Sequence, residues 1–366
     1  MSKLISFLKP FIFQPLNWPK HQPLFSRQYF FLSFGDSLSF LLEHYQFQPL
    51  QQIALLPNFY CPETLKYLSR HFKIVFYQIN DDFSVDKESY FKAIQQHQPG
   101  LIVNYCFTGF TLSEIEKSRL LGLIGNQTII IEDYAHRIVD FKEWQSLSER
   151  HFIIDSIRKH APVLGSHLIN LAFKSSVKAE QWNFYKIKCH LLQLTKGLTA
   201  LLAILLNSQK LHDLSEEMFF LQNQIIGVYP KSTLGNCLSF FLYNCLNLND
   251  LKTHRQELSA CYTNGLTALN QPQLKFINQA ELAKSELNHY PLFVDPNIQE
   301  DLVLYLRQRK IYAERLWETE DIFLNELNLK LYSAFLILPL TANLTPSDAA
   351  LVVSAIGDFF KQARQL

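Results

Sequence analysis

The chain has 366 residues, of which 48% are hydrophobic, and this is enough apolar material to bury the cores of two lobes. Its 34 basic and 33 acidic side chains leave a formal charge of +1, so no net field favours nucleic acid or an anionic membrane as a partner. The six cysteines form no Cys-x-x-Cys pair and no signal-peptide pattern opens the chain. We therefore expect reduced thiols, the cytoplasm, and small molecules or another protein as partners.

The first predicted helix begins near Ser37, after Gly35 and Asp36. A glycine turn that opens a helix presents free backbone N–H groups and the positive end of the helix dipole, which suit a phosphate group. Gly35, Asp36 and Ser37 are therefore a candidate phosphate site, while Ser37 is equally explained as an ordinary N-cap.

Between residues 50 and 170, short β-rich runs alternate with helical patterns, which is typical of a parallel sheet covered by helices on both faces. The predicted helices begin near Pro62, Asp86 and Leu112. The predicted strands cover residues 53–56, 74–78, 101–105, 128–132, 152–154 and 168–171. The pattern predicts an α/β fold whose large domain has three α/β/α layers around a mostly parallel sheet.

The strand at 128–132 ends in polar residues, because Asp133 follows it directly and His136 comes three residues later. Ligands of such sheets bind at the carboxyl ends of the strands. A carboxylate there can keep a pyridine nitrogen protonated, which is what pyridoxal phosphate needs to act as an electron sink. The alternative is that Asp133 caps the next turn.

The strand at 152–154 is followed by Ser156, Arg158 and Lys159. A lysine in this position can form a Schiff base when desolvation and a neighbouring cation such as Arg158 lower its pKa. For an isolated lysine, an ordinary surface position is the more common explanation.

The second half of the chain has a different pattern of predicted elements, with longer helical regions and fewer strands. The apolar segment at 198–206 is too short for a membrane span and predicts a buried helix. A helical region at 234–269, interrupted at 247–250, leads to predicted strands at 290–294 and 335–338. We therefore predict a large domain over 1–235 and a smaller α+β domain over 236–366.

Several common site motifs are missing from the sequence. It contains no Gly-x-Gly-x-x-Gly, no Gly-x-x-x-x-Gly-Lys-Ser/Thr, no His-Glu-x-x-His and no tight Cys/His cluster. Dinucleotide, nucleoside triphosphate and metal sites thus lose their main signals, and we predict no metal.

The candidate segments, in this order and spacing, resemble the DegT/DnrJ/EryC1/StrS family of pyridoxal-phosphate-dependent sugar aminotransferases, which have the aspartate-aminotransferase superfold (fold type I). Residues 56–62, Leu-Pro-Asn-Phe-Tyr-Cys-Pro, look like the family's Pro-x-x-Thr-x segment, and residues 131–136 look like its Glu-Asp-x-Ala-His. Residues 156–163 are similar to a Ser-Leu-Arg-Lys-x-Leu-Pro-Val form. Weaker matches follow in order at 253–258, 310–317 and 338–348.

The resemblance implies a pyridoxal 5′-phosphate cofactor and a role for each candidate residue. Asp133 would pair with the pyridine nitrogen, His136 would reach the phenolic oxygen, and Lys159 would hold the aldehyde. The phosphate would be bound by Gly35, Asp36, Ser37 and Ser156. Tyr60 or Cys61 would cover the ring, and we favour Tyr60 because an aromatic face stacks better.

The resemblance also implies a homodimeric aminotransferase that moves an amino group from glutamate to a nucleotide-linked keto sugar, as in polysaccharide biosynthesis. Lys159 favours transamination over the dehydration of a branch that has histidine in its place. Two departures from the family motivate a catalytically impaired binding or regulatory protein as the alternative: Gly165-Ser166 replaces Gly-Gly, and the substrate-side motif is not recognisable around Asn236.

A more remote alternative is an acyl enzyme that uses Ser156 and Lys159 as a Ser-x-x-Lys motif, with Tyr262 and Asn264 as partners. The companion motifs of such enzymes are missing, and Ser156 follows a strand instead of opening a helix.

Overall fold

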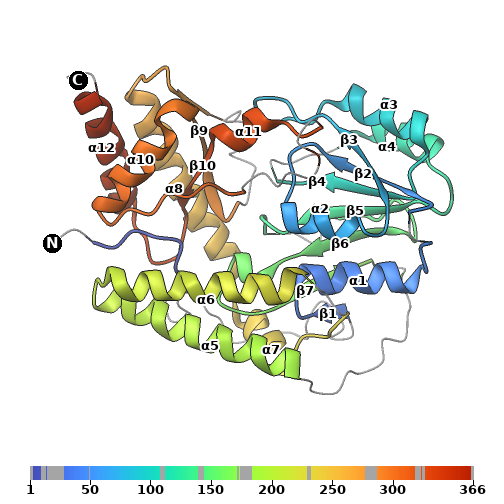
Figure 1. Cartoon of the computed structure of the whole chain (residues 1–366), viewed down its shortest axis with the longest axis horizontal. Coiled ribbons are helices and arrows are strands. Elements are labelled where there is room, and N and C mark those ends of the chain that lie inside the picture. Colours follow the sequence, from blue (N-terminus) through green and yellow to red (C-terminus); the bar gives the residue numbers. More distant parts are fainter. Residues whose placement is uncertain are drawn as a thin grey trace.

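The computed structural model describes residues 3–9, 14, 29–48, 50–107, 112–138, 144–170, 173, 184–228, 232–276, 287–317, 323 and 326–363. In this part of the chain a seven-stranded sheet forms the centre of the larger lobe, in the order β1-β7-β6-β5-β4-β2-β3 (Figure 1). Strands β2 to β6 run parallel, and β7 and β1 add antiparallel pairs at one edge. The predicted α/β class with a mostly parallel sheet is confirmed. The strands are β1 Phe30–Phe31, β2 Ile53–Pro57, β3 Lys73–Tyr77, β4 Leu101–Tyr105, β5 Ile129–Tyr134, β6 His151–Asp155 and β7 Ser166–Ile169.

The central strands form where the sequence has uninterrupted apolar runs. Every residue of β4 and of β6 is buried, as expected for strands that are covered on both faces. The chain leaves β2 toward β3 at the sheet edge and returns to β4 on the other side of β2. Such a reversal of strand order creates a crevice at the carboxyl ends of the strands, where ligands bind.

Four helices cover this sheet: α1 Phe34–His44, α2 Pro62–Leu68, α3 Lys87–His97 and α4 Glu114–Leu123. The last three begin within two residues of their predicted starts. Helix α1 begins one turn earlier than predicted, because Ser33 is the N-cap residue and its side chain accepts a hydrogen bond from the Asp36 N–H.

Helices α5 Phe184–Leu205 and α6 Gln209–Val228 form a long hairpin beside the larger lobe (Figure 1). The prediction of a buried helix at 198–206 is wrong in its burial. The side chains of Leu198 and Leu205 are 58% and 62% exposed, because α5 packs on α6 and leaves its other face open. By length and composition alone, α5 is the one helix of the described chain that could cross a membrane.

The smaller lobe combines helices with a three-stranded antiparallel sheet in the order β10-β9-β8, which confirms the predicted α+β texture. Its strands are β8 Leu274–Lys275, β9 His289–Val294 and β10 Phe335–Pro339. The remaining helices are α7 Cys237–Cys245, α8 Leu248–Ala268, α10 Pro296–Gln308, α11 Leu329–Ala334 and α12 Pro346–Ala363.

The first described residues also contact the smaller lobe. Ile5 forms a parallel bridge with Ile311, and the Lys3 amine lies 2.6 Å from the Asp348 carboxylate. The chain thus reaches the smaller lobe from both of its ends, and the domain boundary near residue 235 stays a prediction.

Candidate active site

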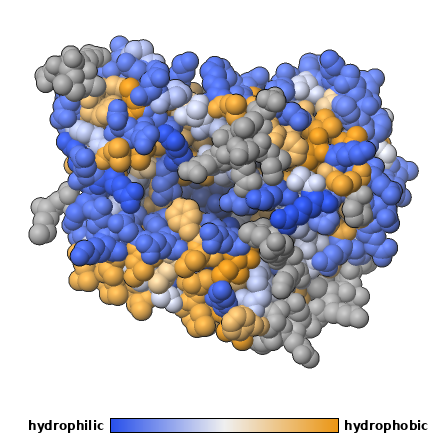
Figure 2. Space-filling model, viewed as in Figure 1, coloured by the Kyte–Doolittle hydropathy of each residue, from blue (hydrophilic) through white to orange (hydrophobic). Residues whose placement is uncertain are grey.

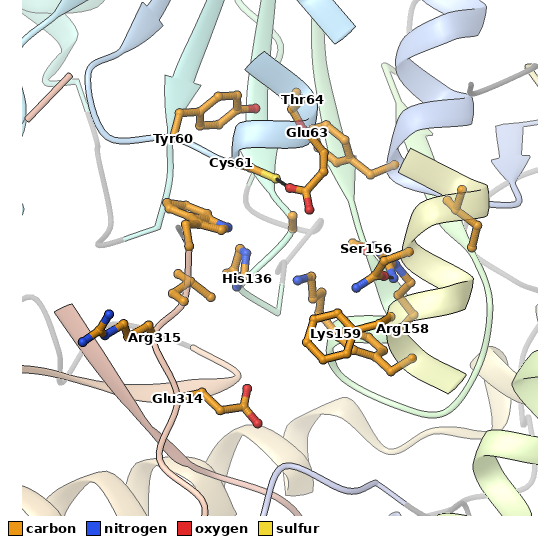
Figure 3. A pocket seen from close by; sticks show the side chains of 18 of the residues that line it. Tyr60, Cys61, Glu63, Thr64, His136, Ser156, Arg158, Lys159, Glu314 and Arg315 are labelled. Atoms are coloured by element: carbon orange, nitrogen blue, oxygen red, sulfur yellow. Dashed lines mark hydrogen bonds between the residues drawn. The ribbon is translucent and has the colours of Figure 1, made fainter. Parts of the chain in front are cut away.

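A cavity of about 960 Å³ lies at the carboxyl ends of the parallel strands, and residues of both lobes line it. Seven of the nine predicted site residues are among them, although they come from four separate segments of the chain. They are Gly35, Tyr60, Cys61, Asp133, His136, Ser156 and Lys159. Figure 3 shows five of these side chains around one space. Asp36 and Ser37 do not line this cavity.

Lys159 ends a 3₁₀ turn, Ile157–Lys159, that follows β6. Burial lowers the pKa of its amine, and the neighbouring Arg158 guanidinium lowers it further. Within the described chain its amine has no hydrogen bond or ion pair. A lysine with a depressed pKa and a free amine is suited to act as a nucleophile.

Asp133 lies at the end of β5, where two donors hold its carboxylate. The Tyr60 hydroxyl donates to Oδ2 at 2.6 Å, and the Ala135 N–H donates to Oδ1 at 2.9 Å. Burial raises the pKa of Asp133 to about 6, against the effect of these hydrogen bonds and of Lys159. At neutral pH the carboxylate is therefore mostly ionised and available to a cation in the cavity.

Tyr60 is fastened at both ends, since its backbone N–H and carbonyl also bond the Tyr332 hydroxyl at 2.9 and 2.6 Å. Its phenol thus points at Asp133. The role of Tyr60 as the residue that covers a cofactor ring stays a prediction, and so does the alternative of Cys61, whose thiol donates to Glu63 at 3.0 Å.

His136 is buried, and burial is the main cause that lowers its pKa well below the usual value, so the ring is neutral. Its Nδ1 lies 3.3 Å from the Asn288 side-chain oxygen, which makes Nδ1 the donor and leaves Nε2 as an acceptor. Asn288 also donates through Nδ2 to the Lys159 carbonyl at 3.1 Å. Asn288, from the smaller lobe, thus joins the two loops that carry His136 and Lys159.

The predicted phosphate site differs in detail from its expected form. Ser33, Phe34 and Gly35, at the start of α1, line the cavity. The Asp36 carboxylate instead accepts from the Thr233 N–H at 3.1 Å and from the Ser33 hydroxyl, and it is fully buried. The Ser37 hydroxyl bonds that of Ser166 at 2.8 Å. Asp36 and Ser37 therefore fix the helix start, and the groups facing the cavity belong to the three residues directly before them.

Two further features of the cavity were not predicted. Tyr105 and Phe107, stacked with centroids 5.5 Å apart, form an aromatic wall, and Phe107 also contacts His136. The strand-end rule that identified Asp133 could have found them, because they end β4. Arg158 donates to the side chain of Asn223 on α6, and this contact with an unpredicted helix has no local signal in the sequence. Among the described residues no group of three or more His, Cys, Asp or Glu could hold a metal ion.

No protein-family profile and no curated protein sequence matches the chain. Solved structures do match it over nearly its whole length, and the fold they share with this chain is that of several pyridoxal-phosphate-dependent aminotransferases. Spr1654 from Streptococcus pneumoniae, named a sugar aminotransferase and solved in its PLP form, has a TM-score of 0.64 at 13% identity, with 98% of this chain and 99% of that chain covered.

Two other solved structures narrow the resemblance. The aminotransferase TlmJ from Streptoalloteichus hindustanus has a TM-score of 0.64 at 13% identity, with 98% and 100% covered. A DegT DnrJ EryC1 StrS aminotransferase from Brucella abortus has a TM-score of 0.56 at 15% identity, with 90% and 85% covered. The fold expected from the sequence is confirmed; at these identities the likeness establishes the fold.

Proposed function

We propose that this chain is a pyridoxal-phosphate-dependent aminotransferase. The observation that carries the proposal is the position of the free, pKa-depressed amine of Lys159, which shares one cavity with the Asp133 carboxylate and the N-terminal end of α1. This set supplies a nucleophile, a carboxylate for a protonated ring nitrogen and backbone donors for a phosphate. As finer proposals, the donor is glutamate, the acceptor is a nucleotide-linked keto sugar for polysaccharide synthesis, and the compartment is the cytoplasm.

The residues present fit the cofactor. A cavity of about 960 Å³ lies at the upper end of the usual range for small-molecule sites, roughly 300–1,000 Å³, and so has room for a cofactor together with a bulky acceptor. Bound there, pyridoxal phosphate would supply an electron sink for negative charge at the donor's α-carbon. The proposed site residues are Gly35, Tyr60, Cys61, Asp133, His136, Ser156 and Lys159 from the large lobe, with Ser33 and Phe34 in place of Asp36 and Ser37.

Each of these residues would have a role that its surroundings favour. Asp133, ionised at neutral pH, would hold a proton at the ring nitrogen. The Lys159 amine, whose pKa is lowered by burial and by Arg158, would take the α-proton of the donor and return it. Ser33, Gly35 and Ser156 would orient the phosphate, and the aromatic wall of Tyr105 and Phe107 would exclude water from one side.

The test is the absorbance spectrum of the purified protein, followed by reduction with borohydride and peptide mapping. We expect a visible band that glutamate bleaches and a reduced adduct on the peptide that contains Lys159. Lys159→Ala should remove the adduct and leave the fold, measured by circular dichroism, unchanged. An adduct that persists on another lysine would contradict the assignment. Colour without bleaching by any amino donor would favour the catalytically impaired alternative.

A further inference from the structure

A second, smaller chamber adjoins the cavity beside Lys159. It has a volume of about 150 Å³ and shares Arg158, Lys159 and His136 with the main cavity. Its other charged lining comes from segments that lie far apart in the sequence, and Glu216 and Glu314 line the main cavity as well. Lys9 belongs to the N-terminal segment, Lys196 to α5, Glu216 to α6, and Glu314 to the segment that follows α10. We call this space the lysine chamber.

The lysine chamber has an excess of basic groups that are not neutralised. Five basic side chains line it against two carboxyl groups: Lys9, Arg158, Lys159, Lys196 and Arg315 against Glu216 and Glu314. In the described part of the chain, none of these seven groups forms a salt bridge. Burial first, and then the charges of other cations, Lys159 among them, lower the pKa values of Lys9 and Lys196 to about 7. Buried cations without counterions are costly, so a ligand that supplies negative charge would stabilise them.

The acids of the chamber do not cancel this excess. Burial, and then the charge of Glu216, raise the pKa of Glu314 to about 8, so Glu314 carries a proton at neutral pH. A protonated carboxyl group can donate a hydrogen bond to an anion. The pKa of Glu216 is also raised by burial.

The cations are arranged on one wall of the chamber. The Arg158 guanidinium carbon lies 5.8 Å, and the Lys196 amine 5.0 Å, from the centre of the Phe219 ring. Arg158 Nε is buried without a hydrogen-bond acceptor, and the Lys196 amine has only Gln222 at 3.4 Å. Figure 3 shows Arg158, Lys159 and Glu314 around the adjoining part of the cavity. The wall therefore offers unused donors within reach of the proposed reactive amine.

The size of the chamber restricts its ligand. About 150 Å³ is below the range of roughly 300–1,000 Å³ in which drug-sized ligands bind, so a nucleotide does not fit. A short chain that ends in a carboxylate does. Because the chamber opens beside Lys159, this chain must belong to a molecule that reacts there.

We propose that the lysine chamber binds the side-chain carboxylate of a small dicarboxylic amino donor, through Lys9, Lys196 and Arg158. This inference rests on the proposed function, because it takes Lys159 as the reacting amine. It adds Lys9 and Lys196, which lie outside the family motifs, to Arg158, which lies within one.

The test measures the binding of glutarate, a dicarboxylate without an amino group, by calorimetry, using the full chain as purified and after loading with pyridoxal phosphate. We expect Lys196→Met and, from a separate segment, Lys9→Met to weaken glutarate binding about tenfold or more, as the loss of a charge-assisted hydrogen bond should. Lys188→Met, on the exposed face of the same helix, should bind glutarate normally. Without ligand, the two chamber variants should melt at the same or a higher temperature than the parent chain at pH 6, where the lysines are mostly charged, because a cation repelled by its neighbours is gone.

Unchanged glutarate affinity in both chamber variants would overturn the proposal. So would sulfate or phosphate that displaces glutarate at equal concentration, because the chamber would then be a general anion site. Glutarate binding that depends on Lys196 in a protein that takes up no pyridoxal phosphate would support the chamber and refute the proposed function. Uptake of the cofactor, together with a glutarate affinity that is unchanged in both chamber variants, would support the proposed function and refute the chamber.

Discussion

The chemistry of Asp133 depends on whether its carboxyl group is ionised, and its surroundings have opposing effects on the pKa of that group. Burial raises the pKa of Asp133 to about 6, whereas the Tyr60 hydroxyl and the Ala135 N–H stabilise the carboxylate. Asp133→Asn keeps the shape and removes the charge, so we expect cofactor binding to persist and the half-reaction with glutamate to slow on the order of a hundredfold. Rapid mixing with glutamate measures this rate, and near-normal rates would leave Asp133 as a turn residue.

Tyr60 provides a second test, because its hydroxyl lowers the pKa of Asp133. Without that donor the folded carboxyl should titrate at a higher pH. The rate depends on the ionised form, so it rises as pH increases through this pKa. We therefore expect Tyr60→Phe to move the acidic limb of the rate profile to higher pH, and Tyr262→Phe, whose hydroxyl bonds the Pro339 carbonyl instead, to leave it in place. If the acidic limb of the rate profile lay at the same pH in the parent chain and in Tyr60→Phe, this coupling would be contradicted.

Asn288 is a positioning residue, since it contacts both the His136 ring and the Lys159 carbonyl. Asn288→Ala should slow the half-reaction by on the order of ten- to a hundredfold through misplacement of the lysine. Asn288→Asp should raise the pKa of His136, because a carboxylate beside Nδ1 favours the charged ring. Titration of the His136 ring by NMR detects this shift, which a purely structural role would not produce. The surface variant Asn297→Ala serves as the control.

The sequence indicates such residues only when they follow a recognisable strand or motif. Asp133 and Lys159 each come just after an apolar run, so the rule of strand ends found them. Asn288 directly precedes β9, and its partners His136 and Lys159 lie 152 and 129 positions away in the sequence. No local pattern in the sequence predicts a contact between residues so far apart.

At the scale of elements, the N-terminal edge of the large sheet depends on two glycines that make room for Phe30. A Cβ atom at Gly165 would lie 2.2 Å from the Phe30 ring, and one at Gly235 would lie 2.3 Å from it. Phe30 is fully buried and cannot move aside without repacking β1 against β7. The departure at Gly165-Ser166 thus keeps the glycine that packing requires.

We expect Gly165→Ala to lower the free energy of unfolding by about 1–3 kcal/mol, as overpacking of a core does. Gly122→Ala is the matched control, because Gly122 lies in α4 with nothing within 4 Å of its added Cβ. Helix propensity alone should make that variant more stable by about 0.5–1 kcal/mol. Urea unfolding of both variants measures the difference between their free energies of unfolding. Equal stabilities would show that the Phe30 ring moves aside at little cost.

The strands and the first helices could be predicted because their signals are local. Short apolar runs such as residues 129–131 and caps such as Asp86 and Ser113 mark them in the sequence itself. The burial of α5 could not be predicted in this way. From its sequence a mostly apolar helix is predicted to be buried. The exposure of Leu198 depends instead on how much of α5 its partner α6 covers.

At the scale of the whole molecule, the exposed face of α5 raises the question of what covers it. Its large apolar residues recur at helical spacing along one stripe: Ile187, Leu191, Leu194, Leu198, Leu202 and Leu205, with exposed fractions from 37% to 69%. Figure 2 shows apolar side chains gathered on this side of the molecule, over α5 and α6. Exposed apolar surface of this extent is typical of interaction sites.

We propose a second copy of the chain as the partner, in a twofold dimer with shared active sites, as the family resemblance implies. Helix α6 supports a link to the cavity, since Phe220 is 63% exposed and also lines its rim. A copy seated on this side would thus lie close to the site. A contribution from its cations to the phosphate is consistent with the lack of a basic residue among Ser33, Phe34 and Gly35.

Sedimentation of the cofactor-loaded protein at micromolar concentration tests this dimer. We expect the mass of two chains for the parent and of one chain for Leu194→Glu combined with Leu198→Glu, because two charges in the centre of an apolar interface cannot be hydrated there. Leu351→Glu, at a comparably exposed leucine on α12, should remain dimeric. The variant that dissociates should also hold pyridoxal phosphate less tightly, since each site would lose its neighbour. A parent chain that sediments as a monomer and still binds the cofactor tightly would refute the shared site, and Arg158 would then be the first cation of the same chain to replace.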